Sequence, residues 1–386
     1  MSRYLLIALM LAALVLSACS GSSKRVIPAD ELSDSQHGAS VSTVWSSNAG
    51  RGIHSVGDAL DPVIEGDRVW VADSRGELTA WDLESGDRVW RKRLGKPVSG
   101  GPALADDLLV VGTREGEVIA LDRNTEAERW RTRLSSEIVS VPAISDDAVV
   151  VLSGDGRLAA LSRDSGSRRW TYDRSMPPLT LRGTSNPKLL GATVLAGLPN
   201  GRLAAVNLAD GREAWQVDVG VASGSSDLDR MRDVDGDPVI VGTQVYVVGY
   251  QGQAMALDLQ QGRVEWARDL SSYSGLDVDA ERVYVSEDNG RVWALDRRSG
   301  AAVWRQDDLE GIRGTAPIVV GDMLVLGDDR GRLTVLDAGD GGILARVRID
   351  RRNGISRNPV VVDDDIVVLT DGGRLQRLRL SRISED

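Results

Sequence analysis

The stretch Gly290 to Trp304, GRVWALDRRSGAAVW, decides the fold because its pattern recurs along almost the whole chain. It reads as a glycine, an apolar alternation that ends in Ala-Leu-Asp296, a turn closed by Gly300, and a tryptophan four residues later. Alternation with a period of two predicts half-buried strands, and glycine and aspartate punctuate them as turns. The stretch is therefore one unit of a repeat of short strands and tight turns.

The other copies keep the same internal spacing even where the distance between copies changes. A seventh copy, Gly331 to Ala345, keeps the spacing but lacks the tryptophan, and a final copy at Gly373 stops before its last strand. Trp45, in the sequence STVWS near the start of the chain, is predicted to lie on the missing strand. The remaining full copies are Gly76 to Trp90, Gly116 to Trp130, Gly156 to Trp170, Gly201 to Trp215 and Gly252 to Trp266.

A second hairpin precedes each glycine, usually introduced by a proline, and this gives eight units of four strands each. Periods near 40 residues with four strands are typical of β-propellers. We predict an all-β, eight-bladed β-propeller of four-stranded antiparallel blades, closed by an N-terminal strand that completes the last blade. Six repeat tryptophans are expected to pack between neighbouring blades: Trp90, Trp130, Trp170, Trp215, Trp266 and Trp304.

The first residues predict export and lipidation. An apolar run after Arg3 ends in Leu16-Ser17-Ala18-Cys19, which resembles the bacterial lipobox, in which the cysteine is acylated and the preceding peptide is removed. We predict a signal peptide over residues 1–18, a lipid anchor and flexible tether over 19–40, and the propeller over 41–386. Ser20 after the cysteine favours the outer membrane, with the protein facing the periplasm.

Composition argues against several classes of function. The formal net charge of −11 gives no electrostatic footprint for nucleic acid. The chain has two histidines and one cysteine, so a histidine metal cluster, a catalytic triad and an internal disulfide are unsupported. Acidic pairs such as Asp106-Asp107 are interpreted as turn formers. We expect no metal, no cofactor and no enzymatic activity.

Two connections between units are longer than the others, and extra length in repeat proteins usually lies in loops of the binding face. The first carries Leu179, Leu181 and Arg182, an apolar spot with a neighbouring charge. The second carries five aspartates, among them Asp233 and Asp235. These aspartates are expected to cap turns, pair with Arg182 or face a basic partner; calcium is an alternative, but the spacing does not match an EF-hand.

These features together resemble the BamB family of lipoproteins from the outer membrane β-barrel assembly machinery. The resemblance rests on the lipobox, the quinoprotein-type repeat, and the segments PLTLRG (178–183) and DRMRDVD (229–235). It implies a scaffold that binds the POTRA domains of BamA and assists folding and insertion of outer membrane proteins. It also implies that Leu179, Leu181, Arg182, Asp233 and Asp235 make the contact. Binding of unfolded outer membrane proteins is a further hypothesis.

Two alternatives remain open. A lipoprotein propeller of this kind is also suited to bind a different envelope partner. A quinoprotein dehydrogenase shares the repeat, but many such enzymes use adjacent cysteines against the cofactor, and this chain has one cysteine and is much shorter.

Overall fold

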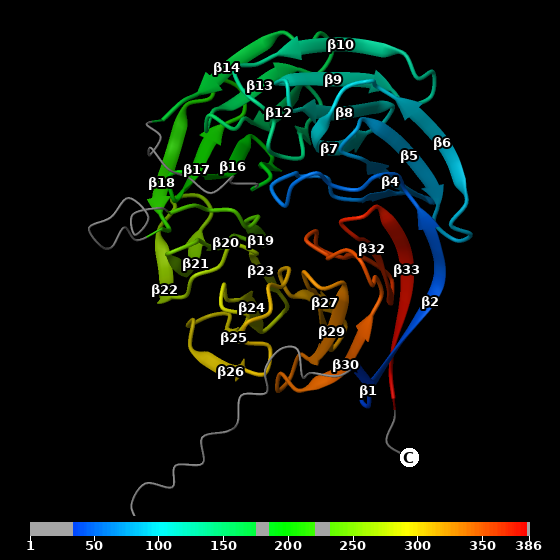
Figure 1. Ribbon diagram of the computed structural model, residues 1–386. Helices are drawn as coiled ribbons and strands as arrows, with labels where there is room; N and C mark the ends of the chain where they lie inside the picture. The colour runs from blue at the N-terminus through cyan, green and yellow to red at the C-terminus, as the bar shows by residue number, and fades with distance from the viewer. Residues whose placement is uncertain (1–33, 175–184, 221–231, 384–386) are drawn as a thin grey trace, which may run out of the picture.

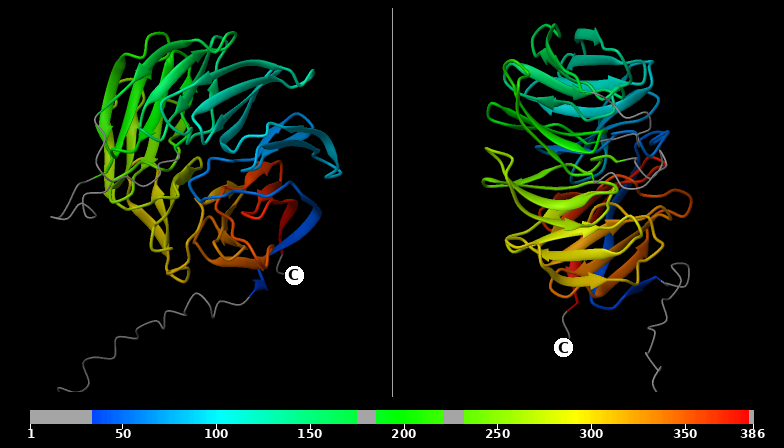
Figure 2. Two further views of the ribbon diagram at one scale, coloured as in Figure 1. Left: turned by 45° about the horizontal axis from the view of Figure 1, so that its top comes forward. Right: turned by 90° about the vertical axis from the view of Figure 1, so that its left-hand side faces the viewer.

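The computed structural model describes residues 34–174, 185–220 and 232–383. Eight antiparallel sheets are arranged as blades around a central axis, in chain order (Figure 1). Figure 2 shows the same ring tilted and edge-on. The predicted eight-bladed propeller is therefore confirmed.

Blades 1 to 4 each contain four consecutive strands. Their bounds are β3 (Val63–Glu65), β4 (Arg68–Ala72), β5 (Glu77–Asp82) and β6 (Arg88–Arg93); β7 (Val98–Ala105), β8 (Leu108–Thr113), β9 (Glu117–Asp122) and β10 (Glu128–Arg133); β11 (Ala143–Ile144), β12 (Ala148–Leu152), β13 (Leu158–Ser162) and β14 (Arg168–Tyr172); and β15 (Lys188–Leu190), β16 (Thr193–Leu198), β17 (Arg202–Asn207) and β18 (Glu213–Asp218).

Blades 5 to 8 repeat this order, and two N-terminal strands, β1 (Ser35–Gln36) and β2 (Ala39–Asn48), join the last two of them. The bounds are β19 (Val239–Val241), β20 (Gln244–Val248), β21 (Gln253–Asp258) and β22 (Val264–Asp269); β23 (Leu276–Val278), β24 (Arg282–Ser286), β25 (Val292–Asp296) and β26 (Ala302–Gln306); β27 (Ile318–Val320), β28 (Met323–Gly327), β29 (Arg332–Asp337) and β30 (Ile343–Arg348); and β31 (Val360–Val362), β32 (Asp365–Leu369) and β33 (Arg374–Arg382).

The ring closes as the sequence predicts. β2 pairs antiparallel with β33 and becomes the outer strand of blade 8. β1 adds a fifth strand to blade 7 by pairing with β30, which the repeat pattern does not indicate. Both strands begin in the stretch that the sequence assigns to the tether, so the ordered sheet starts at Ser35.

Antiparallel alternation gives the propeller two different faces. The turn between the second and third strands of a blade lies on the same face as the connection to the next blade, and we call this the connection face. The other two turns of each blade lie on the opposite face, the hairpin face.

The core is divided into eight layers, one between each pair of neighbouring blades. The second strands read as unbroken apolar runs, such as AVVVL in β12, because both faces of an inner strand are covered by neighbouring blades. The fourth strands alternate between buried and exposed residues because one face meets solvent.

Most repeat tryptophans dock on the next blade at the hairpin face. Trp130 donates its Nε1–H to the carbonyl oxygen of Arg163 at 2.7 Å, and its ring covers Gly166. A Cβ on that glycine would lie 2.5 Å from the ring, so the close approach needs a residue without a side chain. The same indole hydrogen bond is made by Trp45, Trp170, Trp215, Trp266 and Trp304.

Trp90 is the exception. The turn residue of blade 2 that corresponds to Gly166 is Glu126, which has a positive φ of 60° and carries a Cβ. Among the described residues, the indole N–H of Trp90 has no hydrogen-bond partner, and the centroid of its ring lies 5.2 Å from that of Trp70. Trp90 therefore packs against the neighbouring layer but lacks the docking contact.

The predicted roles of the turn aspartates are also confirmed. Asp296 accepts hydrogen bonds from the backbone N–H groups of Arg298 and Ser299, two and three residues on, at 3.2 and 2.8 Å. Asp106 forms a turn with a φ of 54° and pairs with Arg163 at 2.6 Å. The carboxylate of Asp296 therefore holds its own turn, and that of Asp106 pairs with an arginine of the next blade.

Candidate functional site

The two long connections lead into blades 4 and 5 on the connection face. The first follows β14 and is described up to Arg174 and again from Ser185; the second follows β18 and is described up to Gly220 and again from Arg232. Leu179, Leu181 and Arg182 lie outside the described residues, as does Cys19. The described site consists of the residues that hold the returning ends of both connections.

Asn186 and Asp237 tie those two ends together. The backbone N–H of Asn186 donates to Oδ1 of Asp237 at 2.7 Å, and its Nδ2 donates to Oδ2 of the same carboxylate at 3.2 Å. Lys188 pairs with Asp237 at 2.7 Å. The C-terminal ends of the two insertions therefore lie side by side.

The same network extends to blades 1 and 8 across the centre of the ring. Asn186 also donates through Nδ2 to Oδ2 of Asp61 at 3.3 Å, and Arg357 lies 3.8 Å from the other oxygen of Asp61. Solvent reaches 31% of the Asp61 side chain, yet surrounding protein raises its pKa through desolvation; Arg357 opposes this shift and Asp237 adds to it. These contacts bind the insertion-bearing blades to the opposite side of the ring.

Asp233 is buried at the joint between blades 4 and 5. Its backbone carbonyl accepts a hydrogen bond from the N–H of Tyr250 at 2.8 Å, and its side chain is fully buried. Desolvation raises the pKa of this carboxyl far above its usual range, and the nearby charge of Asp235 raises it further. The raised pKa favours the protonated form of this carboxyl, which protein shields from solvent.

Val234 anchors this segment between the two predicted site residues. It is 1% exposed, and its carbonyl oxygen faces Gly197 so closely that a Cβ there would lie 2.6 Å away. The close approach of Val234 to β16 requires a glycine at that position. Asp235, which follows it, is half-buried.

Three buried polar atoms at this joint have no hydrogen-bond partner in the described part of the chain: Ser185 Oγ, Asn200 Oδ1 and Asp233 Oδ2. Buried polar atoms are almost always paired in folded proteins, and exceptions mark functional or strained sites. This concentration beside the two insertions distinguishes the joint between blades 4 and 5.

The sequence analysis missed Asn186 and Asp61, and it considered Asp237 only as one of the five aspartates of the second connection. Each immediately precedes one of the repeat prolines, at the point where a connection enters the innermost strand. A polar residue at a position that is glycine, valine or alanine before Pro102, Pro142 and Pro317 was the available signal, although Asn358 before Pro359 is polar too.

Residues 34–174, 185–220 and 232–383 hold no group of three or more side chains able to bind a metal ion. The aspartates Asp227 and Asp229 of the calcium alternative lie outside them. Within the same ranges, no helix is long and apolar enough to cross a membrane.

Comparison with known proteins gives a consistent result. A family model described as outer membrane protein assembly factor BamB matches residues 35–101, 75–306 and 289–382. A protein of that name from Alkalilimnicola ehrlichii is 52% identical over 369 residues, which cover 96% of this chain and 95% of the relative.

Two solved structures place the fold in context. The crystal structure of BamB from Moraxella catarrhalis superimposes with a TM-score of 0.80 at 28% identity, covering 88% of this chain and 100% of that one. A quinohemoprotein alcohol dehydrogenase from Comamonas testosteroni gives 0.68 at 14% identity, covering 90% of this chain and 78% of that one. At such low identity the second likeness concerns the fold alone.

Proposed function

The chain belongs to the family of the outer membrane protein assembly factor BamB, and from that premise we propose that it is a scaffold lipoprotein that binds the POTRA domains of BamA. It is an assembly factor and not an enzyme. In this proposal Cys19 carries the lipid anchor, residues 1–18 are removed, and the propeller faces the periplasm from the outer membrane.

The observation that carries the proposed binding site is the joint between blades 4 and 5. The returning ends of both insertions are fixed there by Asn186 and Asp237 and tied through Asp61 to the far side of the ring. A binding surface held by a rigid scaffold loses less conformational entropy when a partner docks. We therefore place the POTRA contact on the two insertions, with Leu179, Leu181 and Arg182 as its anchor.

Asp233 and Asp235 have different roles in this proposal. Asp233 positions the second insertion, because its backbone carbonyl accepts the N–H of Tyr250 and its buried carboxyl accepts the N–H of Val234. Asp235 is half-buried, and in this proposal it contributes to the contact with the partner.

The test is a pull-down of the POTRA region of BamA by residues 20–386, comparing the parent with Leu181→Ala, Arg182→Ala. The matched control is Leu190→Ala, Arg212→Ala, which removes the same residue types from the hairpin face of blade 4; Leu190 is 40% exposed and the Arg212 side chain 87%. We expect binding by the parent and the control and loss in the insertion variant. If all three proteins bind equally, the POTRA contact does not lie on the insertions. If a folded parent does not bind, a different envelope partner is favoured.

A second part of the proposal concerns unfolded outer membrane proteins. Most fourth strands leave one backbone edge unpaired, and four carry an outward valine: Val44, Val89, Val264 and Val303. An unpaired edge can accept an extended segment as an added strand. Photo-crosslinkers placed at these valines should capture unfolded barrel proteins during assembly, and a lack of crosslinks at all four positions would remove this part.

A further inference from the structure

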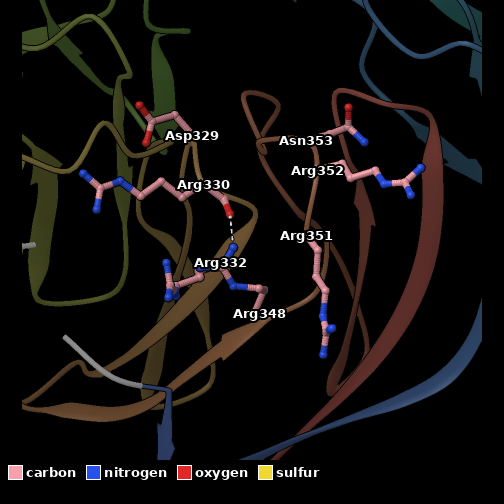
Figure 3. Close-up of a pocket in the computed structure, with 7 residues that line it drawn as sticks. All are labelled: Asp329, Arg330, Arg332, Arg348, Arg351, Arg352 and Asn353. Carbon is pink, nitrogen blue, oxygen red and sulfur yellow. Dashed lines mark hydrogen bonds between the residues drawn. The ribbon is translucent and has the colours of Figure 1, made fainter. Parts of the chain in front are cut away.

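A basic pocket lies on the connection face of blade 7, away from the two insertions. It has a volume of about 340 Å³ and is lined by the turn between β28 and β29 on one side and the connection from β30 to β31 on the other (Figure 3). Five of its seven lining residues are arginines, and we call them the arginine surface: Arg330, Arg332, Arg348, Arg351 and Arg352. The other two are Asp329 and Asn353.

Little of this positive charge is neutralised. Among the residues that the structure describes, no carboxylate pairs with Arg330, Arg351 or Arg352 within 4.0 Å. Burial raises the pKa of Asp329, and the neighbouring Asp328 raises it further. In a chain with a net charge of −11, elsewhere rich in Arg–carboxylate pairs, such a concentration is unusual.

The backbone beneath the arginine surface is held in place by two buried aspartates. Oδ1 of Asp328 accepts the N–H groups of Arg330 and Arg332 at 2.9 and 2.8 Å. Oδ1 of Asp350 accepts the N–H of Arg352 at 2.9 Å. These carboxylates fix the turns, and the exposed side chains of Arg330, Arg351 and Arg352 remain directed away from the core.

The side chains do not converge on one point. Figure 3 shows Arg330 and Arg332 on one side of the pocket, Arg352 directed to the other and Arg351 directed along it. This arrangement does not enclose a single small anion, but it suits several phosphate groups spread over a surface. Arg binds phosphate well because its planar guanidinium offers paired donors.

The N-terminal part of the chain enters the propeller beside this surface. Asp34 pairs with Arg332 at 3.0 Å, and β1 follows it along the edge of β30. The 15 positions from Cys19 to Asp34 can span at most about 50 Å when fully extended. A lipid anchor at Cys19 would therefore hold the arginine surface close to the membrane.

We propose that the arginine surface binds the phosphate groups of anionic membrane lipids and orients the propeller on the membrane. The choice of lipid, and not free phosphate, rests on the proposed anchorage at Cys19 and on the spread of the arginines. Charges are screened beyond about 8 Å at physiological salt, so local positive charge attracts an anionic surface despite the negative net charge of the chain.

The test uses unlipidated residues 20–386, which contain every strand of the closed ring, and so does not depend on the anchor. Flotation with vesicles of phosphatidylcholine containing about 30% phosphatidylglycerol is compared with pure phosphatidylcholine at about 0.15 M salt. The variant is Arg351→Gln, Arg352→Gln. The control, Arg212→Gln, Arg298→Gln, removes the same charge from exposed turns of the hairpin face.

We expect the parent and the control to float with the anionic vesicles alone. The arginine variant should partition about twentyfold less, because each arginine at an anionic surface contributes on the order of fivefold. Absence of parent binding, or equal binding by variant and control, overturns the proposal. Release of the protein from the vesicles by inorganic phosphate at constant ionic strength would indicate a site for free phosphate and would also overturn the proposal. The POTRA pull-down with the same variants is expected to be unchanged, so the two proposals fail separately.

Discussion

The docking of Trp130 on Gly166 of the next blade predicts a large and local effect of Gly166→Ala. The added Cβ would lie 2.5 Å from the Trp130 ring and 2.7 Å from Oγ1 of Thr132. Relief requires the indole to move and to weaken its 2.7 Å hydrogen bond to Arg163. Overpacking of this kind costs about 1–3 kcal/mol, and a lost hydrogen bond about 1 kcal/mol.

The positive φ of Gly166, 68°, adds about 1 kcal/mol for any residue with a side chain. Gly242→Ala separates this cost from docking, because Gly242 has a similar φ of 62° and no atom within 4 Å of the added Cβ. We expect about 3–5 kcal/mol for Gly166→Ala and about 1 kcal/mol for Gly242→Ala.

The assay is urea unfolding followed by far-UV circular dichroism, with near-UV circular dichroism reporting the tryptophan environment. The Gly166 variant should unfold at a clearly lower urea concentration and show a changed tryptophan signal. If both variants lose the same stability, the ring does not depend on tryptophan docking and the reasoning is wrong.

Three further predictions use the same unfolding assay. Glu126→Gly should stabilise the protein by about 1 kcal/mol, because it relieves a positive φ and lets Trp90 dock; a loss of stability would contradict this. Trp45→Ala should cost about 3–5 kcal/mol and more than Trp90→Ala, since Trp45 docks and Trp90 does not; equal costs would count against the distinction. Burial raises the folded-state pKa of Asp233, so its contribution to stability falls as pH rises above about 4. The free energy of unfolding of Asp233→Asn should therefore rise relative to that of the parent between pH 5 and 8, by up to about 1.4 kcal/mol per pH unit. A difference in stability that does not change with pH would refute the raised pKa of Asp233.

The blade count, the closing strand and the tryptophan positions could be predicted because they repeat at a fixed spacing. The departure of Trp90 was also readable, since Glu126 stands where other units have glycine. The network that joins Asn186, Asp237 and Asp61 was harder to predict. Asn186 and Asp61 are 125 residues apart, and they meet because the ring brings the starts of all innermost strands to one axis.

The arginine surface depends in the same way on three-dimensional closure. Arg330 and Arg332 lie on one turn, while Arg351 and Arg352 lie in a connection about 20 residues later. In sequence they read as ordinary solvated charges. Two observations from the described structure distinguish them: Arg330, Arg351 and Arg352 have no carboxylate partner there, and β1 brings Asp34 to Arg332. β1 has no periodic signal in the sequence because it is two residues long.

The absent tryptophan at Ala345 follows from how the ring closes. A tryptophan of blade 7 would dock on the turn between the third and fourth strands of blade 8, but those strands, β33 and β2, come from opposite ends of the chain and share no turn. Two other contacts join blades 7 and 8 at this place. Gly38 packs against Leu344, and Arg382 pairs with Asp322 at 3.0 Å and also with Asp337.

The chain that comes from the proposed anchor also enters the propeller at this joint. The strand next to the anchor and the strand that closes the ring are different ones, β1 and β2. β1 contacts β30 through two residue pairs, whereas β2 contacts β33 through nine and adds the docked Trp45. A pull on the N-terminal segment would therefore strip β1 from blade 7 before it disturbed the strand that closes the ring. Because Asp34 and β1 leave the edge of the arginine surface, loss of β1 would free Arg332 from its carboxylate and leave the propeller closed.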